Sequence, residues 1–143
     1  RNDRAGAIRY LNDLAVLEPD ADQYLFEVAR LLVQLDRIEE AKSQLTEICN
    51  KFPDRPMGFL GLADLYLESL NDPTSAIPLV EQAIAIQPIA ENYLKLAAAH
   101  ERSGSIRAAL DAMNEAVRLA PSNVQYNQMR ELLRRRVDDG NSK

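Results

Sequence analysis

The stretch AKSQLTEICNKFP, residues 41–53, decides the fold. Leu45 and Ile48 follow Ala41 at the fourth and seventh positions, and this spacing places the three side chains on one face of a helix. Pro53 ends that helix, because proline has no N–H to donate and forces the preceding residue out of the helical region. The stretch therefore predicts a helix with one apolar face and a fixed end.

The same pattern occurs four times along the chain. Prolines separated by 34, 35 and 33 residues each follow an alanine by twelve positions, and each alanine is followed by apolar residues four and seven positions later. A period of this length indicates a repeat architecture. The four pairs are Ala7 and Pro19, Ala41 and Pro53, Ala76 and Pro88, and Ala109 and Pro121.

A second pattern precedes three of these alanines. Its members lie at offsets of 0, 3, 4 and 7 residues, again on one helical face. The third member is small, which lets another helix approach closely. Each unit is therefore predicted to be a helix, a short turn, a second helix and a proline stop. The sets are Leu25, Val28, Ala29 and Leu32; Phe59, Leu62, Ala63 and Tyr66; and Tyr93, Leu96, Ala97 and His100.

The two patterns predict helices and no strands. The helices are expected at roughly 3–17, 22–35, 37–51, 56–70, 74–86, 90–102, 106–119 and 123–136. One repeat is a residue longer, and starting its second helix at Thr74 keeps Pro78 near the first turn. Asp20 and Ser122 predict capped helix starts, and Gly104 predicts the left-handed residue that follows a helix.

The composition is that of a folded chain of one domain's length. It has 143 residues, of which 46% are hydrophobic and 27% charged, and no apolar run exceeds four residues, so no membrane insertion is expected. The net charge of −5 argues against general nucleic-acid binding. One His and one Cys exclude a disulfide framework and argue against a metal site. The lone cysteine favours a cytoplasmic location and is compatible with a periplasmic one.

Residues 3–121 resemble the tetratricopeptide repeat family. Its signature is a large residue, then Leu-Gly, then Tyr in a first helix, followed by Ala, an aromatic residue and Pro in a second helix. This chain departs from it: Trp is absent, Ala replaces the Gly, and His100 stands at one Tyr position. The resemblance implies an all-α, right-handed superhelical solenoid of antiparallel helix pairs. It would contain about three full repeats, an N-terminal half repeat and a C-terminal capping helix.

The resemblance also divides the chain, which is expected to be a single array over 1–143. We expect a half repeat at 3–19, full repeats at 22–53, 56–88 and 90–121, a capping helix at 123–136 and a tail at 137–143. Residues 3–17 match the second helix of a pair without its first helix, which suggests part of a longer protein. The face of Ile8, Leu11 and Leu14 should then lack its usual cover, and it is the candidate surface for self-association as a homodimer.

The family implies a concave groove that is lined by the first helices and binds an extended peptide or a partner's helix. It implies no catalytic residue and no cofactor. The position after each first-helix anchor points into the groove in this family, and here these positions form an apolar stripe flanked by mixed charge. The candidate groove residues are Phe26, Leu60 and Leu94, then Arg30, Asp64 and Ala98, then Gln34, Glu68 and Arg102.

Some relatives bind the acidic C-terminus of a chaperone through paired Lys and Asn residues. The matching positions here are Phe26, Arg30, Gly61, Glu91 and Lys95, of which two are basic and none is Asn. This clamp is therefore not expected.

The functional hypothesis is a non-catalytic protein-interaction module that acts as a scaffold or adaptor in a complex. Its partner would be a protein or peptide segment, with no metal and no cofactor. Two alternatives stay open: a targeting arm of a larger enzyme, such as a glycosyltransferase, whose catalytic domain lies elsewhere, and a self-association module. The candidate groove residues could also merely pack between neighbouring helices. For His100, Cys49 and the arginines at 130–136, packing or solvated charge is the favoured interpretation.

Overall fold

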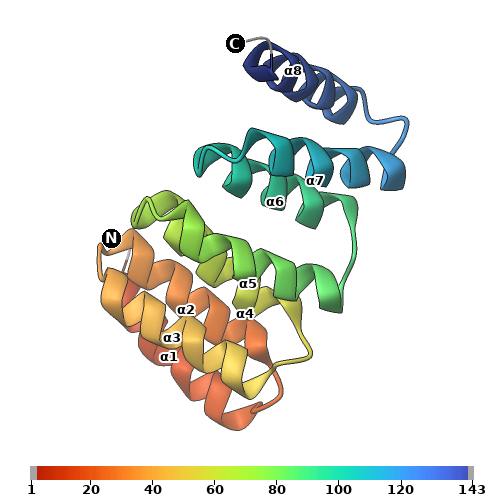
Figure 1. The fold of residues 1–143 in the computed structure, drawn as a ribbon. Helices are drawn as coiled ribbons and strands as arrows, with labels where there is room; N and C mark the ends of the chain where they lie inside the picture. Colours follow the sequence, from red (N-terminus) through yellow and green to blue (C-terminus); the bar gives the residue numbers. More distant parts are fainter. Residues whose placement is uncertain (1–2, 142–143) are drawn as a thin grey trace.

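The computed structural model describes residues 3–141. Over that range the secondary structure is entirely helical, and the helices stack in chain order from the N-terminal to the C-terminal end of an elongated array (Figure 1). The all-α fold is therefore confirmed. The elements are α1 (Arg4–Leu17), α2 (Asp22–Gln34), α3 (Ile38–Lys51), α4 (Pro56–Asp64), the π-helical turn η1 (Leu65–Ser69), α5 (Pro73–Ile86), α6 (Ala90–Arg102), α7 (Ile106–Leu119) and α8 (Val124–Asn141).

The helices alternate between two roles. We call α2, α4 with η1, and α6 the first helices, and α3, α5 and α7 the second helices, as in the predicted units. Three of the pattern alanines, Ala41, Ala76 and Ala109, have an exposed fraction of 0%. Their small side chains let each second helix lie close to its neighbours, and the buried residues form successive clusters along the stack in place of one central core.

Gly58 marks the closest approach between α3 and α4. A Cβ atom at this position would lie 2.8 Å from Cγ2 of Ile48 and 3.0 Å from the backbone nitrogen of Cys49. Real Cβ atoms essentially never show a distance as short as 2.8 Å, so a larger residue here would force Ile48 or the backbone of α3 to shift.

The second repeat differs from the prediction, because the helix expected over 56–70 changes to a π turn at Leu65. Each first helix ends with a backbone hydrogen bond across the turn that follows it. In the first and third repeats this bond spans five residues, and in the second it spans six, so the π turn accommodates the extra residue. The bonds are Arg37 N to Leu32 O (2.9 Å), Ser105 N to His100 O (2.8 Å) and Asp72 N to Tyr66 O (2.8 Å).

Helix α5 begins at Pro73, one residue earlier than predicted. Asp72 is the N-cap residue, since its carboxylate accepts hydrogen bonds from the Ser75 backbone N–H (3.1 Å) and the Ser75 hydroxyl (2.6 Å). These two bonds fix the start, and Pro78 consequently lies inside the helix and not near its first turn.

Two other predicted caps are wrong. Helix α2 begins at Asp22 with no side-chain cap from Asp20, and α8 is capped by Asn123, whose Oδ1 accepts a hydrogen bond from Tyr126 N at 3.1 Å, and not by Ser122. Gly104 has a φ of 84°, which confirms the predicted left-handed residue after α6.

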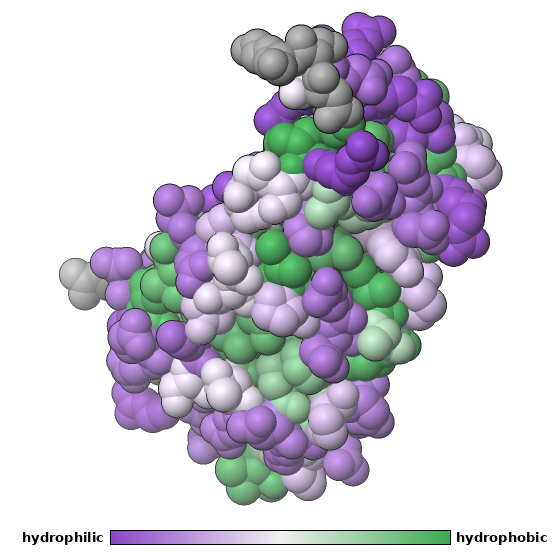
Figure 2. All heavy atoms as spheres, in the orientation of Figure 1, coloured by the Kyte–Doolittle hydropathy of each residue, from purple (hydrophilic) through white to green (hydrophobic). Residues whose placement is uncertain are grey.

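The predicted tail at 137–143 is also wrong for the described part of the chain. Helix α8 continues to Asn141, because no proline follows position 136 and Val137 packs against the C-terminal core cluster. Residues 142 and 143 lie outside the described range. Tyr126 and Leu133 are buried on one face of α8, while much of the visible surface at this end is hydrophilic (Figure 2).

Candidate partner-binding site

A hollow of about 290 Å³ lies between α2 and α4, and we call it the α2–α4 hollow. Its floor is apolar, because α2, α3, α4 and η1 all contribute apolar residues there. Charged and polar side chains stand at its rim. The lining residues are Phe26, Ala29, Val33, Leu45, Gly61 and Leu65 for the apolar part, and Arg30, Gln34, Asp64, Glu68 and Ser69 for the polar part.

Gly61 explains why the hollow forms at this repeat. The residues 34 positions before and after it are Glu27 and Lys95, so the other first helices carry a long side chain where α4 has none. A Cβ atom at Gly61 would lie 2.6 Å from Cε2 of Phe26 and 2.8 Å from Cδ2 of Leu45. The ring of Phe26 therefore packs directly against the backbone of α4.

The charges at the rim are paired. Arg30 forms an ion pair with Glu27 at 2.6 Å within α2, and this hydrogen bond raises the pKa of the Arg30 guanidinium. On the opposite side, the exposed carboxylates of Asp64 and Glu68 project from α4 and η1. The hollow thus has an apolar floor between one basic and two acidic side chains.

Ion pairs connect successive helices along this side of the array. Asp64 of α4 pairs with Lys95 of α6, and Glu68 of η1 pairs with Arg102 of α6 at 2.8 Å. Arg102 also donates a 2.5 Å hydrogen bond to the carbonyl of Leu67. The next link joins α6 to α8. Asp64, Glu68 and Arg102, which the sequence analysis predicted to be groove residues, thus form ion pairs between neighbouring repeats.

The structure brings five predicted groove residues together around the hollow: Phe26, Arg30, Gln34, Asp64 and Glu68. It does not place the other four in its lining. Leu60, Leu94 and Ala98 are half-buried, with Leu94 packed against the C-terminal cluster, and Arg102 is engaged with Glu68. A binding role for any of these residues stays a prediction.

Sequence reasoning missed most of the floor. Ala29 and Leu45 belong to the helix-pair core in the sequence patterns and are almost fully buried, and their position at the bottom of the hollow beside Val33 depends on the distance between α2 and α4. The sequence did contain one signal for the hollow: Gly61 has no side chain, whereas the equivalent residues of the other repeats, Glu27 and Lys95, have long ones.

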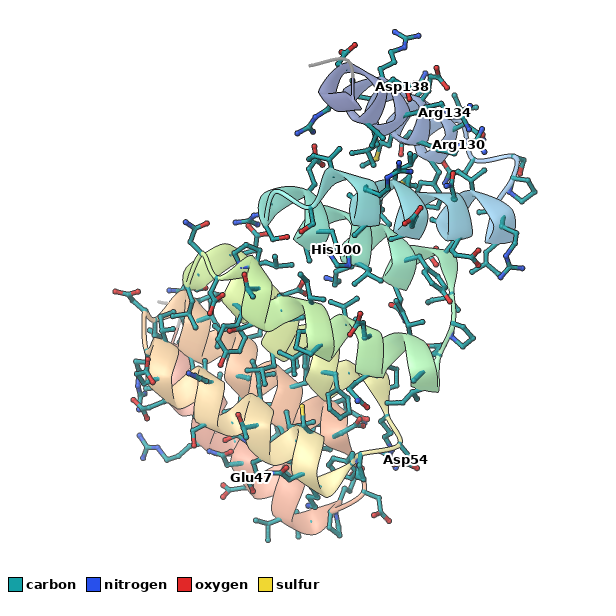
Figure 3. The ribbon with its side chains drawn as sticks, viewed as in Figure 1. Glu47, Asp54, His100, Arg130, Arg134 and Asp138 are labelled. Carbon is teal, nitrogen blue, oxygen red and sulfur yellow. The ribbon has the colours of Figure 1, made fainter. Side chains whose placement is uncertain are left out.

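The titratable side chains that could take part in catalysis or metal binding lie on different elements of the array. Figure 3 shows Glu47 on α3, Asp54 in the loop after it, His100 on α6, and Arg130, Arg134 and Asp138 on α8. Within residues 3–141, no group of His, Cys, Asp and Glu side chains could hold a metal ion, and no helix is long and apolar enough to cross a membrane. Cys49 is buried, and this burial raises the pKa of its thiol.

The candidate self-association surface of Ile8, Leu11 and Leu14 is partly buried in the structure. Ile8 and Leu11 are half-buried and pack against the core cluster of α2, α3 and α4. Leu14 is also half-buried. More exposed apolar residues on α1 are Tyr10, Val16 and Leu17.

The chain belongs to the tetratricopeptide repeat family. The sequence profile of that family, described as a tetratricopeptide repeat, matches residues 26–88 and again 60–124. Together these overlapping matches cover most of the chain, and they include most of α2, both sides of the hollow and the whole third repeat. No curated protein sequence matches the chain.

Solved structures share the fold. MamA, residues 41 to the end, from Desulfovibrio magneticus RS-1 has a TM-score of 0.77 at 24% identity, over 99% of this chain and 80% of that one. The first tetratricopeptide domain of Spaghetti (RPAP3), bound to the HSP90 peptide SRMEEVD, has a TM-score of 0.72 at 17% identity, covering 83% and 94%. YrrB, described as having an unusual peptide-binding site, has a TM-score of 0.73 at 14% identity, covering 96% and 71%.

Proposed function

We propose that this chain is a non-catalytic protein-interaction module. It binds an extended peptide or an amphipathic helix, and the α2–α4 hollow receives one apolar side chain of that ligand. The observation that carries the proposal is the apolar floor of the hollow on the first-helix side of the array. Two structural relatives, the Spaghetti domain and YrrB, are described with a bound peptide or a peptide-binding site.

The size and chemistry of the hollow favour an aliphatic or aromatic anchor. Burying one such side chain contributes about 1.5–3 kcal/mol. The two basic residues at the positions of the chaperone clamp, Arg30 and Lys95, are already paired with Glu27 and Asp64. An acidic C-terminus would have to compete with those carboxylates, so the anchor is apolar and not a carboxylate.

The test is selection of binding peptides from a displayed random library, followed by affinity measurements on variants. Gly61→Ala places a methyl group against Phe26 and Leu45 and should weaken binding about tenfold or more, since the ring is pushed toward the hollow. Gly140→Ala is the matched control, because a Cβ atom there meets nothing within 4 Å. Selected peptides that lack an apolar residue, or that bind both variants equally, would contradict the proposal.

A further inference from the structure

On the side of the α2–α4 hollow formed by α4 and η1, the carboxylate of each ion pair is more exposed than its cation. The side chain of Asp64 is 51% exposed and that of its partner Lys95 is 27% exposed. The side chain of Glu68 is 72% exposed and that of its partner Arg102 is 36% exposed. A charged group that approaches from the solvent therefore comes closer to the two carboxylates than to the two cations.

Both carboxylates also keep hydrogen-bonding capacity. Lys95 donates to Oδ1 of Asp64, and Arg102 donates to Oε1 of Glu68. Within residues 3–141, Oδ2 of Asp64 and Oε2 of Glu68 accept no hydrogen bond. Because an ionised carboxylate accepts several hydrogen bonds at once, each of them can bind a further donor and still keep its present partner.

The α2 side of the hollow has no such bias toward one charge. The side chains of Arg30 and Glu27 are 53% and 41% exposed, and the guanidinium donates to Glu27 through Nε at 2.9 Å and Nη2 at 2.6 Å. The two opposite charges reach the solvent to a similar extent, so this pair selects neither sign. A positive group of a ligand is therefore favoured on the side of α4 and η1, and the net charge of −5 attracts such a ligand at long range.

We infer that the ligand of the α2–α4 hollow is a basic segment, in which one apolar side chain enters the hollow and a nearby Lys or Arg binds Asp64 and Glu68. This inference rests on the proposed function and adds the charge of the ligand and its orientation. Both carboxylates line the hollow that receives the anchor. The basic residue consequently lies within about four positions of the anchor, the spacing of side chains that share one face of a strand or helix.

An acidic segment is the competing ligand, and the same geometry disfavours it. Its carboxylate would lie against the exposed oxygens of Asp64 and Glu68, and like charges that meet at an interface oppose binding. To pair with Arg102 it would have to displace Glu68. It would also have to compete for a guanidinium that donates to the Leu67 carbonyl at 2.5 Å.

Peptides selected from a displayed library test the charge of the ligand. Those that bind the native chain should carry an apolar anchor with a Lys or Arg within about four positions of it. Changing that Lys or Arg to Gln in a selected peptide should weaken binding about fivefold, the effect of an exposed ion pair. This preference should decrease as the salt concentration rises above about 0.1 M, because exposed charges are screened. The change lies in the peptide, so the fold of the chain is untouched.

Variants of the chain locate the contact. The double variant Asp64→Asn and Glu68→Gln should bind the basic peptide and its Gln form equally. Glu47→Gln with Glu81→Gln is the matched control, because it removes the same charge from exposed positions on α3 and α5 that do not line the hollow, and it should keep the preference. Circular dichroism and urea unfolding verify that both are folded. If the first variant is unstable, Glu68→Gln alone should still reduce the preference.

The outcomes separate this inference from the proposed function. Three results would overturn the inference alone: anchored peptides without a nearby basic residue, a preference that survives loss of both carboxylates, and a preference that disappears in the control. Peptides whose affinity depends neither on their apolar anchor nor on Gly61 would overturn the proposed function, and this inference with it.

Discussion

The ring of Phe26 packs against the backbone of α4 at Gly61, where a Cβ atom would come within 2.6 Å of its Cε2 atom. This contact sets the width of the α2–α4 hollow on one side. On the side formed by α4 and η1, the carboxylates of Asp64 and Glu68 are held by ion pairs with α6. The lack of a side chain at Gly61 and the charged side chains of Asp64 and Glu68 therefore define the shape of the hollow.

Replacing Gly61 with Ala should change the free energy of unfolding by less than about 1 kcal/mol. Alanine is favoured over glycine in a helix interior by about 1 kcal/mol, and displacement of the Phe26 and Leu45 side chains offsets that gain. Urea unfolding measures the net change, and NMR of the Phe26 ring protons reports the displacement. Unchanged ring shifts would contradict the predicted contact.

Gly58→Ala should destabilise the fold by about 1–3 kcal/mol. Here the added methyl group meets the backbone nitrogen of Cys49 at 3.0 Å as well as the side chain of Ile48, and a backbone cannot turn aside as a side chain can. Thermal and urea unfolding of both glycine variants provide the comparison. Equal stability of Gly58→Ala and Gly61→Ala would contradict this distinction.

Arg102→Ala should cost more stability than Glu68→Ala, although the two residues form one ion pair. Glu68 is exposed and its pairing contributes at most about 1 kcal/mol. Arg102 also donates to the Leu67 carbonyl, one of the carbonyls near the end of the first helix. Its loss should cost about 1–2 kcal/mol, since that carbonyl loses a charged donor. Urea unfolding of the two single variants decides the order.

Asp72 should make stability depend on pH at the acidic end. Hydrogen bonds from Ser75 hold the pKa of the Asp72 carboxyl below its ordinary value of 3.8. A lowered folded-state pKa means that the stabilisation is complete above that ordinary value and is lost as the pH falls through the lowered one. Asp72→Asn keeps a capping oxygen but does not titrate, so its difference from the native chain should change only below about pH 4. A difference that is constant from pH 7 to pH 3 would contradict the assignment.

Cys49 should react slowly with iodoacetamide in the folded chain. Burial raises the pKa of its thiol, and the reactive thiolate is therefore scarce at neutral pH. The rate should increase strongly in denaturant and modestly in Gly58→Ala, where the helix that contacts Cys49 is displaced. Mass spectrometry of timed samples measures it. Rapid alkylation of the native chain would show that α3 and α4 open readily.

Most of the fold was predictable because each repeat carries the same residue pattern and forms the same interface between helices. Ala41, Ala76 and Ala109 occupy equivalent buried positions, and one alignment of the patterns therefore located all three. Helix ends were less predictable. The start of α5 depends on two hydrogen bonds to Ser75, and the length of α8 depends on the packing of Val137, neither of which a period reveals.

The candidate site was predictable only in part. Helical spacing put Phe26 and Arg30 on the same side of α2, and the structure places both at the hollow. The contribution of Leu45 from the neighbouring second helix depends on the distance between helices, which sequence spacing does not contain. Likewise, the engagement of Asp64 with Lys95 depends on how one repeat is rotated against the next.

The π turn at Leu65–Ser69 also bears on how such a chain changes over evolutionary time. The extra residue of the second repeat lies inside a helix, so the turn at Asn71 keeps the left-handed backbone that Asp36 and Gly104 have in the other repeats. An extra residue accommodated within the helix leaves the turn that follows in the same conformation as in the other repeats. Selection can therefore lengthen a repeat by one residue without rebuilding its neighbours, and an alignment gap belongs within that helix and not in the loop.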